Sequence, residues 1–294
     1  PKHDAVRWNI AVYISAWRDQ HVVALHNIDL DIPRGEVCCI FGTSGSGKST
    51  LLNQLAGLEK PTRGVVRIGG VPISQLNENQ LAAFRQKHIG FVFQSYNLLP
   101  ELTAAENVAM PLMFKGIDPD VRLLEAKKML CRVGLKDRMD HFPNQMSGGQ
   151  QQRTALARIL VGKPKILMLD EPFSALDSYL REEVEGEVGS LLAGFAGTAL
   201  LVTHNRDEAY RLCRDMIVMD GGQVLRTGTT KEVFADPGST AAARLTGCKN
   251  ILPCTRVDAH SVRLAGSESL LHLAAEVPKG CTAVGIRAHD FAPC

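Results

Sequence analysis

The chain has 294 residues, enough for one large α/β domain and a small appendage. Its net charge of +2 at pH 7 gives no basis for nucleic-acid binding, which needs a concentrated basic surface. Its longest apolar stretches, 166–169 and 199–202, have the length of strands and are too short to cross a membrane. Any contact with a membrane is therefore expected to come through a partner.

The predicted elements alternate along the chain. Strands are predicted at 10–15, 37–41, 89–93, 166–169 and 198–202. Helical patterns are found at 48–58, 119–133, 149–160 and 206–212. This alternation predicts an α/β fold with a mostly parallel sheet covered by helices. Residues 95–146 are mostly helical in pattern and are expected to form a separate subdomain.

The predicted helix at 119–133 has clear ends. Asp118 can cap it, Pro119 suits its first turn, and Gly134 can terminate it. Its apolar stripe is predicted to consist of Val121, Leu124, Met129 and Val133.

The pattern changes near the C-terminus. Segments 216–219 and 223–227, joined by Asp220-Gly221-Gly222, are predicted to form a hairpin that closes the sheet. After Pro237, short alternating segments at 261–264, 270–273 and 283–286 indicate a small β module, which we expect to be truncated. The predicted domains are therefore 1–237 and 238–294.

Eight cysteines occupy positions 38, 39, 131, 213, 248, 254, 281 and 294. No two have CxxC spacing, and their positions do not resemble a disulfide framework. We expect free thiols in a reducing compartment. Cys38 and Cys39, inside an apolar run, are expected to pack as small hydrophobes.

A phosphate-binding pattern, GxxxxGK[ST], follows the second predicted strand. It consists of Gly42, Thr43, Ser44, Gly45, Ser46, Gly47, Lys48 and Ser49, with Thr50 next. Glycines let the backbone wrap closely around phosphates, and the helix that follows adds its positive dipole end. Lys48 can contact the β and γ phosphates, while the Ser49 hydroxyl can ligate Mg²⁺. Chance produces this pattern in roughly one chain in a hundred, but a strand before it and a helix after it favour a functional loop.

Two adjacent carboxylates end the apolar strand at 166–169. An unpaired buried charge is unfavourable, so Asp170 and Glu171 would not be expected at the end of a buried strand with a purely structural role. Beside a phosphate loop, Asp170 would hold Mg²⁺ through water and Glu171 would polarise the attacking water. The alternative is a strand that simply runs into solvent.

The segment Ser147-Gly148-Gly149, which continues as QQQR, precedes an apolar helix. On its own, SGG is a common loop or helix cap. In this chain the phosphate loop, SGGQQQR, LMLDE and the following SALD occur in the order found in ATP-binding cassette (ABC) ATPases. Over about residues 20–237 the sequence therefore resembles that family.

The resemblance implies roles for several further residues. Gln94 resembles the glutamine that joins the two subdomains and senses Mg²⁺, and His204 resembles the switch histidine at the γ-phosphate. Asp177 belongs to the SALD segment and is counted with the nucleotide-binding residues. Alone, Gln94 and His204 would be structural residues at strand ends. The family also implies a dimer in which the phosphate loop of one protomer faces Ser147, Gly148 and Gly149 of the other, with two ATP molecules between them.

An aromatic residue before the phosphate loop usually stacks on adenine in this family. Trp17 and Tyr13 are the candidates. Trp17 is favoured because it lies seven residues before Ala24-Leu25, close to the spacing that the family leads us to expect. The alternative is a surface tryptophan.

Two parts of the chain resemble different transporters. Residues 20–172 resemble cassettes of lipoprotein-release and macrolide-type exporters, whereas residues 173–294 resemble molybdate or tungstate importer ATPases. We expect an ATPase that drives membrane permease subunits from the cytoplasmic face of the membrane, with molybdate or a similar oxyanion as cargo. The alternatives are an exporter ATPase and a non-transport ABC ATPase. The latter usually has two cassettes or a long coiled-coil insertion, and neither is seen here.

Overall fold

The computed structural model describes residues 15–17, 20–22, 24–174, 176, 178–274 and 276–287. Its centre is a six-stranded sheet in the order β10-β9-β3-β8-β7-β6. The strands are β3 (Val37–Phe41), β6 (Ile89–Val92), β7 (Ile166–Asp170), β8 (Thr198–Thr203), β9 (Asp215–Asp220) and β10 (Gln223–Thr229). All neighbouring pairs are parallel except β9 and β10, which form the antiparallel hairpin at the edge. The predicted sheet and its closing hairpin are thus confirmed.

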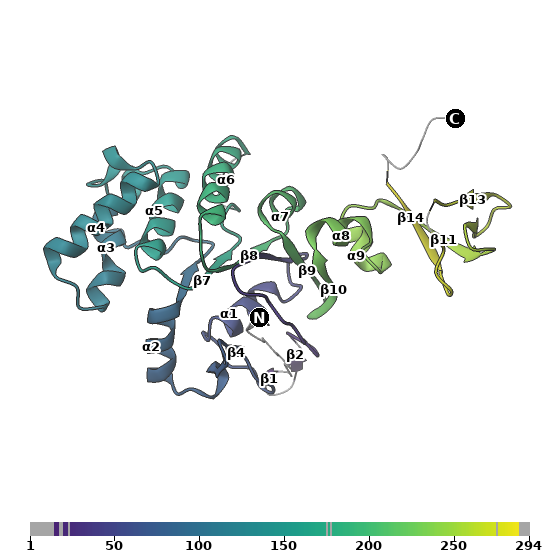
Figure 1. Cartoon of the computed structure of the whole chain (residues 1–294), viewed down its shortest axis with the longest axis horizontal. Coiled ribbons are helices and arrows are strands. Elements are labelled where there is room, and N and C mark those ends of the chain that lie inside the picture. The colour runs from purple at the N-terminus through teal and green to yellow at the C-terminus, as the bar shows by residue number, and fades with distance from the viewer. Residues whose placement is uncertain are drawn as a thin grey trace, which may run out of the picture.

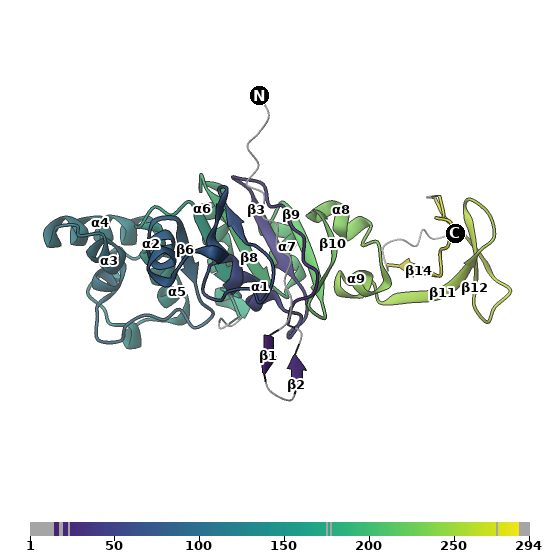
Figure 2. The same ribbon diagram turned by 90° about the horizontal axis from the view of Figure 1, so that it is seen from below.

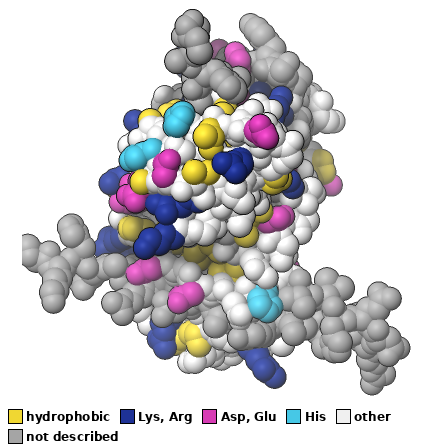
Figure 3. All heavy atoms as spheres, turned by 90° about the vertical axis from the view of Figure 1, so that its right-hand side faces the viewer, with side chains coloured by type: hydrophobic (Ala, Val, Ile, Leu, Met, Phe, Trp, Pro, Cys, Tyr) yellow, Lys and Arg dark blue, Asp and Glu magenta, His cyan; other side chains and the backbone are white. Residues whose placement is uncertain are grey.

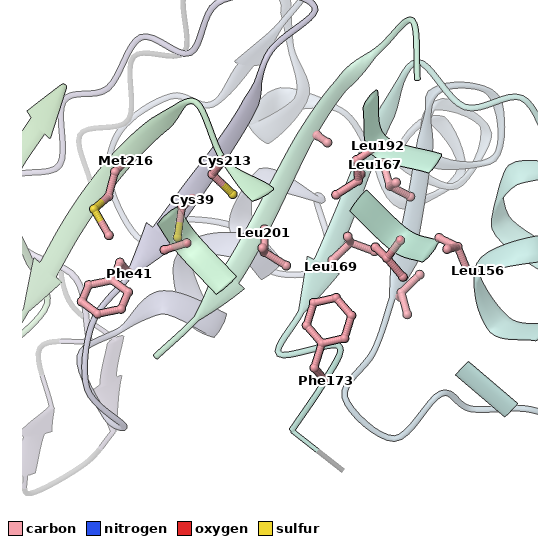
Figure 4. Close-up of a cluster of buried hydrophobic side chains, with 14 of the residues drawn as sticks. Cys39, Phe41, Leu156, Leu167, Leu169, Phe173, Leu192, Leu201, Cys213 and Met216 are labelled. Atoms are coloured by element: carbon pink, nitrogen blue, oxygen red, sulfur yellow. The ribbon is translucent and has the colours of Figure 1, made fainter. Parts of the chain in front are cut away.

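Side chains at alternate positions of the strands belong to two different buried clusters. Ile40 and Met168 belong to one cluster, and Phe41 and Leu169 belong to the other. Because successive side chains of a strand point to opposite faces, these clusters are the two sides of the sheet. Figure 4 shows part of the second cluster. The helices associated with the sheet are α1 (Lys48–Leu55), α2 (Glu78–His88), α5 (Gly148–Leu160), α6 (Ser178–Ala193), α7 (Arg206–Leu212), α8 (Thr230–Ala235) and α9 (Thr240–Leu245).

Several predicted elements need correction. Helix α1 ends at Leu55 rather than at residue 58, because Gly57 adopts a left-handed φ of 65° just beyond it. Helices α2, α6, α8 and α9 and strand β11 (Asn250–Arg256) had no predicted counterpart. In α2 only Leu81 is buried, so this segment lacks the repeated spacing of apolar residues by which a helix is predicted from sequence. The strand expected at 10–15 lies mostly outside the described residues; Ser15 begins β1 (Ser15–Trp17), which pairs with β2 (Gln20–Val22).

Helices α3 (Ala104–Phe114) and α4 (Pro119–Arg132) pack with α5 around a third buried cluster, on the left in Figure 1. Asp118 caps α4 as predicted, accepting a hydrogen bond from the Asp120 amide at 3.0 Å. The predicted apolar stripe is half wrong, because Val121 and Leu124 are 50% and 54% exposed. The buried side of α4 is formed instead by Ala126, Met129, Leu130 and Val133, a face turned away from Val121 and Leu124.

A second sheet lies at the other end of the molecule, on the right in Figures 1 and 2. It is antiparallel, with the order β13-β12-β11-β14, and comprises β11, β12 (Ser261–Leu264), β13 (Leu270–His272) and β14 (Ala283–Ile286). Its buried cluster is small: Cys254, Val262, Val277 and Val284. Figure 3 views this end of the molecule and shows basic, acidic and hydrophobic side chains interspersed on its surface.

Helix α9 follows the domain boundary that we expected at Pro237. Ala242 in this helix is fully buried and belongs to the second cluster of the core sheet. Helix α9 therefore packs on the cassette as well as preceding the C-terminal sheet. A short ribbon of β4 (Arg67–Ile68) and β5 (Val71–Pro72) completes the described strands.

Among the described residues, no helix has the length and apolar character needed to span a membrane. The seven cysteines in the described part of the chain are free thiols. Cys38 and Cys39 are 4% and 0% exposed and pack in the two clusters that cover the core sheet, as expected of small hydrophobes.

Candidate active site

The loop between β3 and α1 is shaped by glycines. Gly45 and Gly47 have left-handed φ values of 78° and 94°. A Cβ atom at Gly42 would lie 2.3 Å from the carbonyl oxygen of Met219, so only glycine fits there. Helix α1 begins directly after Gly47 and presents its N-terminus to the loop. Glycine-rich backbone at a helix N-terminus is suited to bind an anion such as a phosphate group.

Lys48 is held inside this loop. Its side chain is only 4% exposed, and its Nζ donates a hydrogen bond to the Thr43 carbonyl at 2.7 Å. Burial lowers the pKa of Lys48, while the nearby carboxylates of Glu171 and Asp170 act in the opposite direction. The ammonium is thereby fixed at the position where the loop would meet a phosphate.

Ser49 and Asp170 face each other across the loop. The Ser49 hydroxyl donates to Asp170 Oδ1 at 3.1 Å. Burial raises the pKa of Asp170, and the neighbouring Glu171 carboxylate raises it further, while the Ser49 hydrogen bond lowers it. A hydroxyl and a carboxylate are hard oxygen ligands of the kind Mg²⁺ prefers, and a cation here would favour the ionised carboxylate. The residues present therefore fit Mg²⁺ bound beside phosphates.

Glu171 lies between two nitrogen-bearing side chains. Its Oε1 is 3.2 Å from His204 Nδ1 and 3.9 Å from Lys48 Nζ. The backbone of Glu171 has a φ of 44°, which is uncommon for a residue with a side chain. Its amide donates a hydrogen bond to the Val202 carbonyl at 3.0 Å. Because β7 and β8 are parallel neighbours, Glu171 and His204 come from the same edge of the sheet.

A cavity of about 520 Å³ lies beside the phosphate loop and Glu171. It is lined by Ala24, Ser44, Gly45, Gly47, Lys48, Ser49, Thr50, Gln94, Glu171, Gly221 and Gly222. Gln94, which follows β6, thus lies beside the loop as the sequence predicted.

The sequence did not predict that Ala24, Gly221 and Gly222 border the cavity. The Gly222 amide donates to the Ser46 carbonyl at 3.1 Å, and a Cβ atom at Gly222 would lie 2.6 Å from the Ala24 carbonyl oxygen. The adjacent glycines of the hairpin turn were the available signal. Alone they indicate only a turn, because nothing local to the turn reveals that β9 pairs with β3.

The Ser147-Gly148-Gly149 segment lies elsewhere. Ser147 caps α5: its hydroxyl accepts from the Gln150 amide at 3.4 Å, and the Gln150 side chain accepts from the Ser147 amide at 3.1 Å. Gly148 and Gly149 pack close to Leu176 and Val184. These residues do not line the cavity at the phosphate loop of their own chain.

Three of the predicted site residues lie wholly or partly outside the part of the chain that the structure describes. Tyr13 and Asp177 lie outside the described residues. Trp17 is the last residue of β1, and only its backbone is described. Which aromatic residue stacks on adenine therefore stays a prediction.

The fold and the geometry of this site define a phosphate-loop nucleotide-binding protein. The family profile "ABC transporter" matches residues 25–174. The chain belongs to the ABC transporter ATP-binding family. It is accordingly an ATPase that uses ATP and Mg²⁺.

Relatives and solved structures agree with this assignment. The chain is 43% identical over 216 residues to the ABC transporter ATP-binding protein YtrE of Bacillus subtilis, covering 74% of this chain and 93% of YtrE. It is 43% identical to the macrolide export ATP-binding/permease protein MacB of Nitrosomonas europaea, over 74% of this chain and 33% of MacB. The dimeric, post-hydrolysis ATP-binding cassette MJ0796 bound to ADP and Pi matches with a TM-score of 0.70 and 37% identity, over 76% of this chain and 98% of that one.

These similarities bear on the cargo that we expected from the sequence. The similarity to YtrE and MacB extends over about three quarters of the chain, so it is not confined to residues 20–172. Neither relative's name refers to molybdate or another oxyanion, and MacB is named for macrolide export.

Proposed function

We propose that this chain is the ATPase subunit of an exporter-type ABC transporter of the MacB or lipoprotein-release kind. The similarity to MacB, a named macrolide exporter, supports this direction of transport. The chain spans only 33–39% of the MacB proteins it matches, so the comparison concerns their cassette and not their membrane part.

The observation that carries the catalytic proposal is the placement of Glu171 between Lys48 and His204 at one edge of the sheet. Lys48 and the loop amides bind the β and γ phosphates of ATP. Ser49, Asp170 and Gln94 hold Mg²⁺, which supplies positive charge to the phosphate oxygens. Glu171 accepts a proton from the water that attacks the γ-phosphate, and His204 keeps the Glu171 carboxylate oriented and contacts the same phosphate.

The position of Ser147, Gly148 and Gly149 supports a sandwich dimer. They lie at the start of α5 and do not line the cavity of their own chain, so in this proposal they close over the ATP of a second protomer. The N-terminus of α5 then points at the γ-phosphate and adds favourable dipole energy. Asp177, which lies outside the described residues, is assigned to nucleotide binding by its place in the SALD segment.

A permease contact is supported by apolar side chains exposed on α3, α4 and the turn between them. These are Met113, Phe114, Ile117, Val121 and Leu124, each between 37% and 63% exposed. Exposed apolar side chains gathered on one subdomain mark interaction surfaces. We assign them to a cytoplasmic helix of the membrane partner, which places the cassette at the cytoplasmic face of the membrane.

Steady-state ATPase activity measured beside ATP affinity tests the catalytic assignment. Glu171→Gln should retain ATP binding and lose about 10²–10⁴-fold in turnover, the scale of a positioned general base. Glu101→Gln, at an exposed position away from the cavity, is the matched control and should be fully active. A Glu171→Gln protein with normal turnover contradicts the assignment.

Purification of the complex from membranes tests the direction of transport. An exporter partner should have a large extracytoplasmic domain and no associated solute-binding protein. Recovery of an oxyanion-binding protein with the permease would instead support import.

A further inference from the structure

Two thiols of the C-terminal sheet are in contact. Cys254 lies in β11 and Cys281 lies just before β14, and their Sγ atoms are 3.9 Å apart. The Cys281 thiol donates a hydrogen bond to the Ala283 carbonyl at 3.3 Å, so the hydrogen between the two sulfurs belongs to Cys254. The backbone fixes the pair as well, because the Cys254 amide donates to the Thr282 carbonyl at 3.0 Å. A disulfide requires these two sulfurs to approach to about 2.05 Å.

The two thiols differ in accessibility. Cys254 is 5% exposed and belongs to the buried cluster of the sheet. Cys281 is partly exposed and lines a cavity of about 1070 Å³ between this sheet and helices α7, α8 and α9. Burial raises the pKa of Cys254 to about 11, and the Cys281 thiol beside it contributes. A reagent from solvent therefore reaches Cys281 first, and Cys254 is placed to react with the product.

The surrounding sheet is small. Its fully buried core has four side chains, and Cys254 is one of them. Small cores contribute little stability, and small domains are commonly reinforced by covalent cross-links. A bond between Cys254 and Cys281 would close a loop that contains β12 and β13, and would join β11 to the chain entering β14.

We propose that Cys254 and Cys281 are a redox-active dithiol that a hydroperoxide converts to a disulfide, which staples the C-terminal sheet. The Cys281 sulfur attacks the peroxide, an S–O bond forms, the O–O bond breaks, and water leaves, or an alcohol if the oxidant is an organic hydroperoxide. The Cys254 sulfur then attacks the sulfenic sulfur of Cys281. The S–S bond forms, the S–O bond breaks, and the departing hydroxide takes the Cys254 proton as water. A dithiol reductant restores both thiols.

Peptide mapping of the full chain tests the cross-link. The protein is treated with hydrogen peroxide, its remaining thiols are alkylated, and it is digested with trypsin without reduction. Cleavage at the lysines and arginines of this region releases fragments 250–256 and 280–287, each with one cysteine. We expect these two fragments joined, with a mass two hydrogens below their sum, and separated again by a reductant.

Variants and proteolysis provide the controls. Cys281→Ser should abolish the joined fragment, while Cys131→Ser, at an exposed cysteine on α4, should leave it intact. Protease cleavage within residues 250–287 should be at least tenfold slower after oxidation of the unaltered protein, and this protection should disappear on reduction. Oxidation of Cys281 to sulfinic acid without a joined fragment, or joining of Cys281 to Cys248 instead, would overturn the proposal.

Discussion

His204 holds the carboxylate of Glu171 across two neighbouring strands: imidazole Nδ1 lies 3.2 Å from Oε1. The imidazole is 59% exposed, whereas the carboxylate is 19% exposed. Glu171 is therefore oriented by a side chain that remains open to solvent and to an incoming phosphate. The arrangement resembles a general base with its orienting partner, the pairing found in many hydrolytic sites.

His204→Ala should lower ATP turnover by about 10²-fold or more and leave ATP affinity within a few-fold, because it frees the Glu171 carboxylate without altering the phosphate loop. His141→Ala is the control. That histidine contacts Arg138 in the helical subdomain and should not affect turnover. Equal losses in both variants would indicate a general loss of folding rather than a role for His204.

The sandwich dimer can be tested by light scattering. Glu171→Gln protein should dimerise with ATP and remain monomeric with ADP. Adding Ser147→Arg should prevent dimerisation, because a bulky cation would replace the cap of α5 at the proposed partner site. Ser190→Arg, at an exposed position in α6, should dimerise normally. A dimer that persists with Ser147→Arg would place the interface elsewhere.

Stability should depend on pH through Asp215, at the start of β9. Burial, and then the adjacent Glu36 carboxylate, raises its pKa from 3.8 to about 6. The folded-state pKa exceeds the unfolded-state value, so protonation favours folding below about pH 4, and this contribution is lost as the pH rises through 6. Asp215→Asn should increase the free energy of unfolding by about 1 kcal/mol at pH 7.5. This is less than the full pKa shift implies, because solvent screens the partly exposed carboxylate.

Urea unfolding at two pH values measures this effect. The difference between Asp215→Asn and the unaltered protein should vanish near pH 4. Asp137→Asn, at an exposed position, should show no such dependence. An Asp215→Asn protein less stable at pH 7.5 would show that the carboxylate is needed by Arg214 or another cation nearby.

Two truncations can locate the domain boundary. Removing residues 250–294 should preserve ATPase activity, since every proposed catalytic residue precedes them. Removing residues 238–294 also deletes α9, whose Ala242 is buried against the cassette. This longer deletion should lower the free energy of unfolding of the cassette by about 2 kcal/mol. Equal stability of the two proteins would support the boundary at Pro237, whereas we propose one after α9.

Features that depend on neighbouring residues could be predicted from the amino-acid sequence. The phosphate loop, the capped helix at Pro119 and the two carboxylates at the end of β7 are each contiguous, so spacing and residue type were enough to predict them. Strand β11 was missed because Pro253 and short apolar runs weaken its local pattern.

Features that depend on contacts between distant segments follow from the folded chain and not from local sequence. The exposure of Val121 and Leu124 follows from how α3 and α5 pack on α4, which helical periodicity alone does not specify. Similarly, Gly222 borders the phosphate loop because β9 inserts next to β3, and Glu171 meets His204 because β7 and β8 are adjacent. Strand order is set by the packing of the whole core, so it cannot be predicted from local sequence.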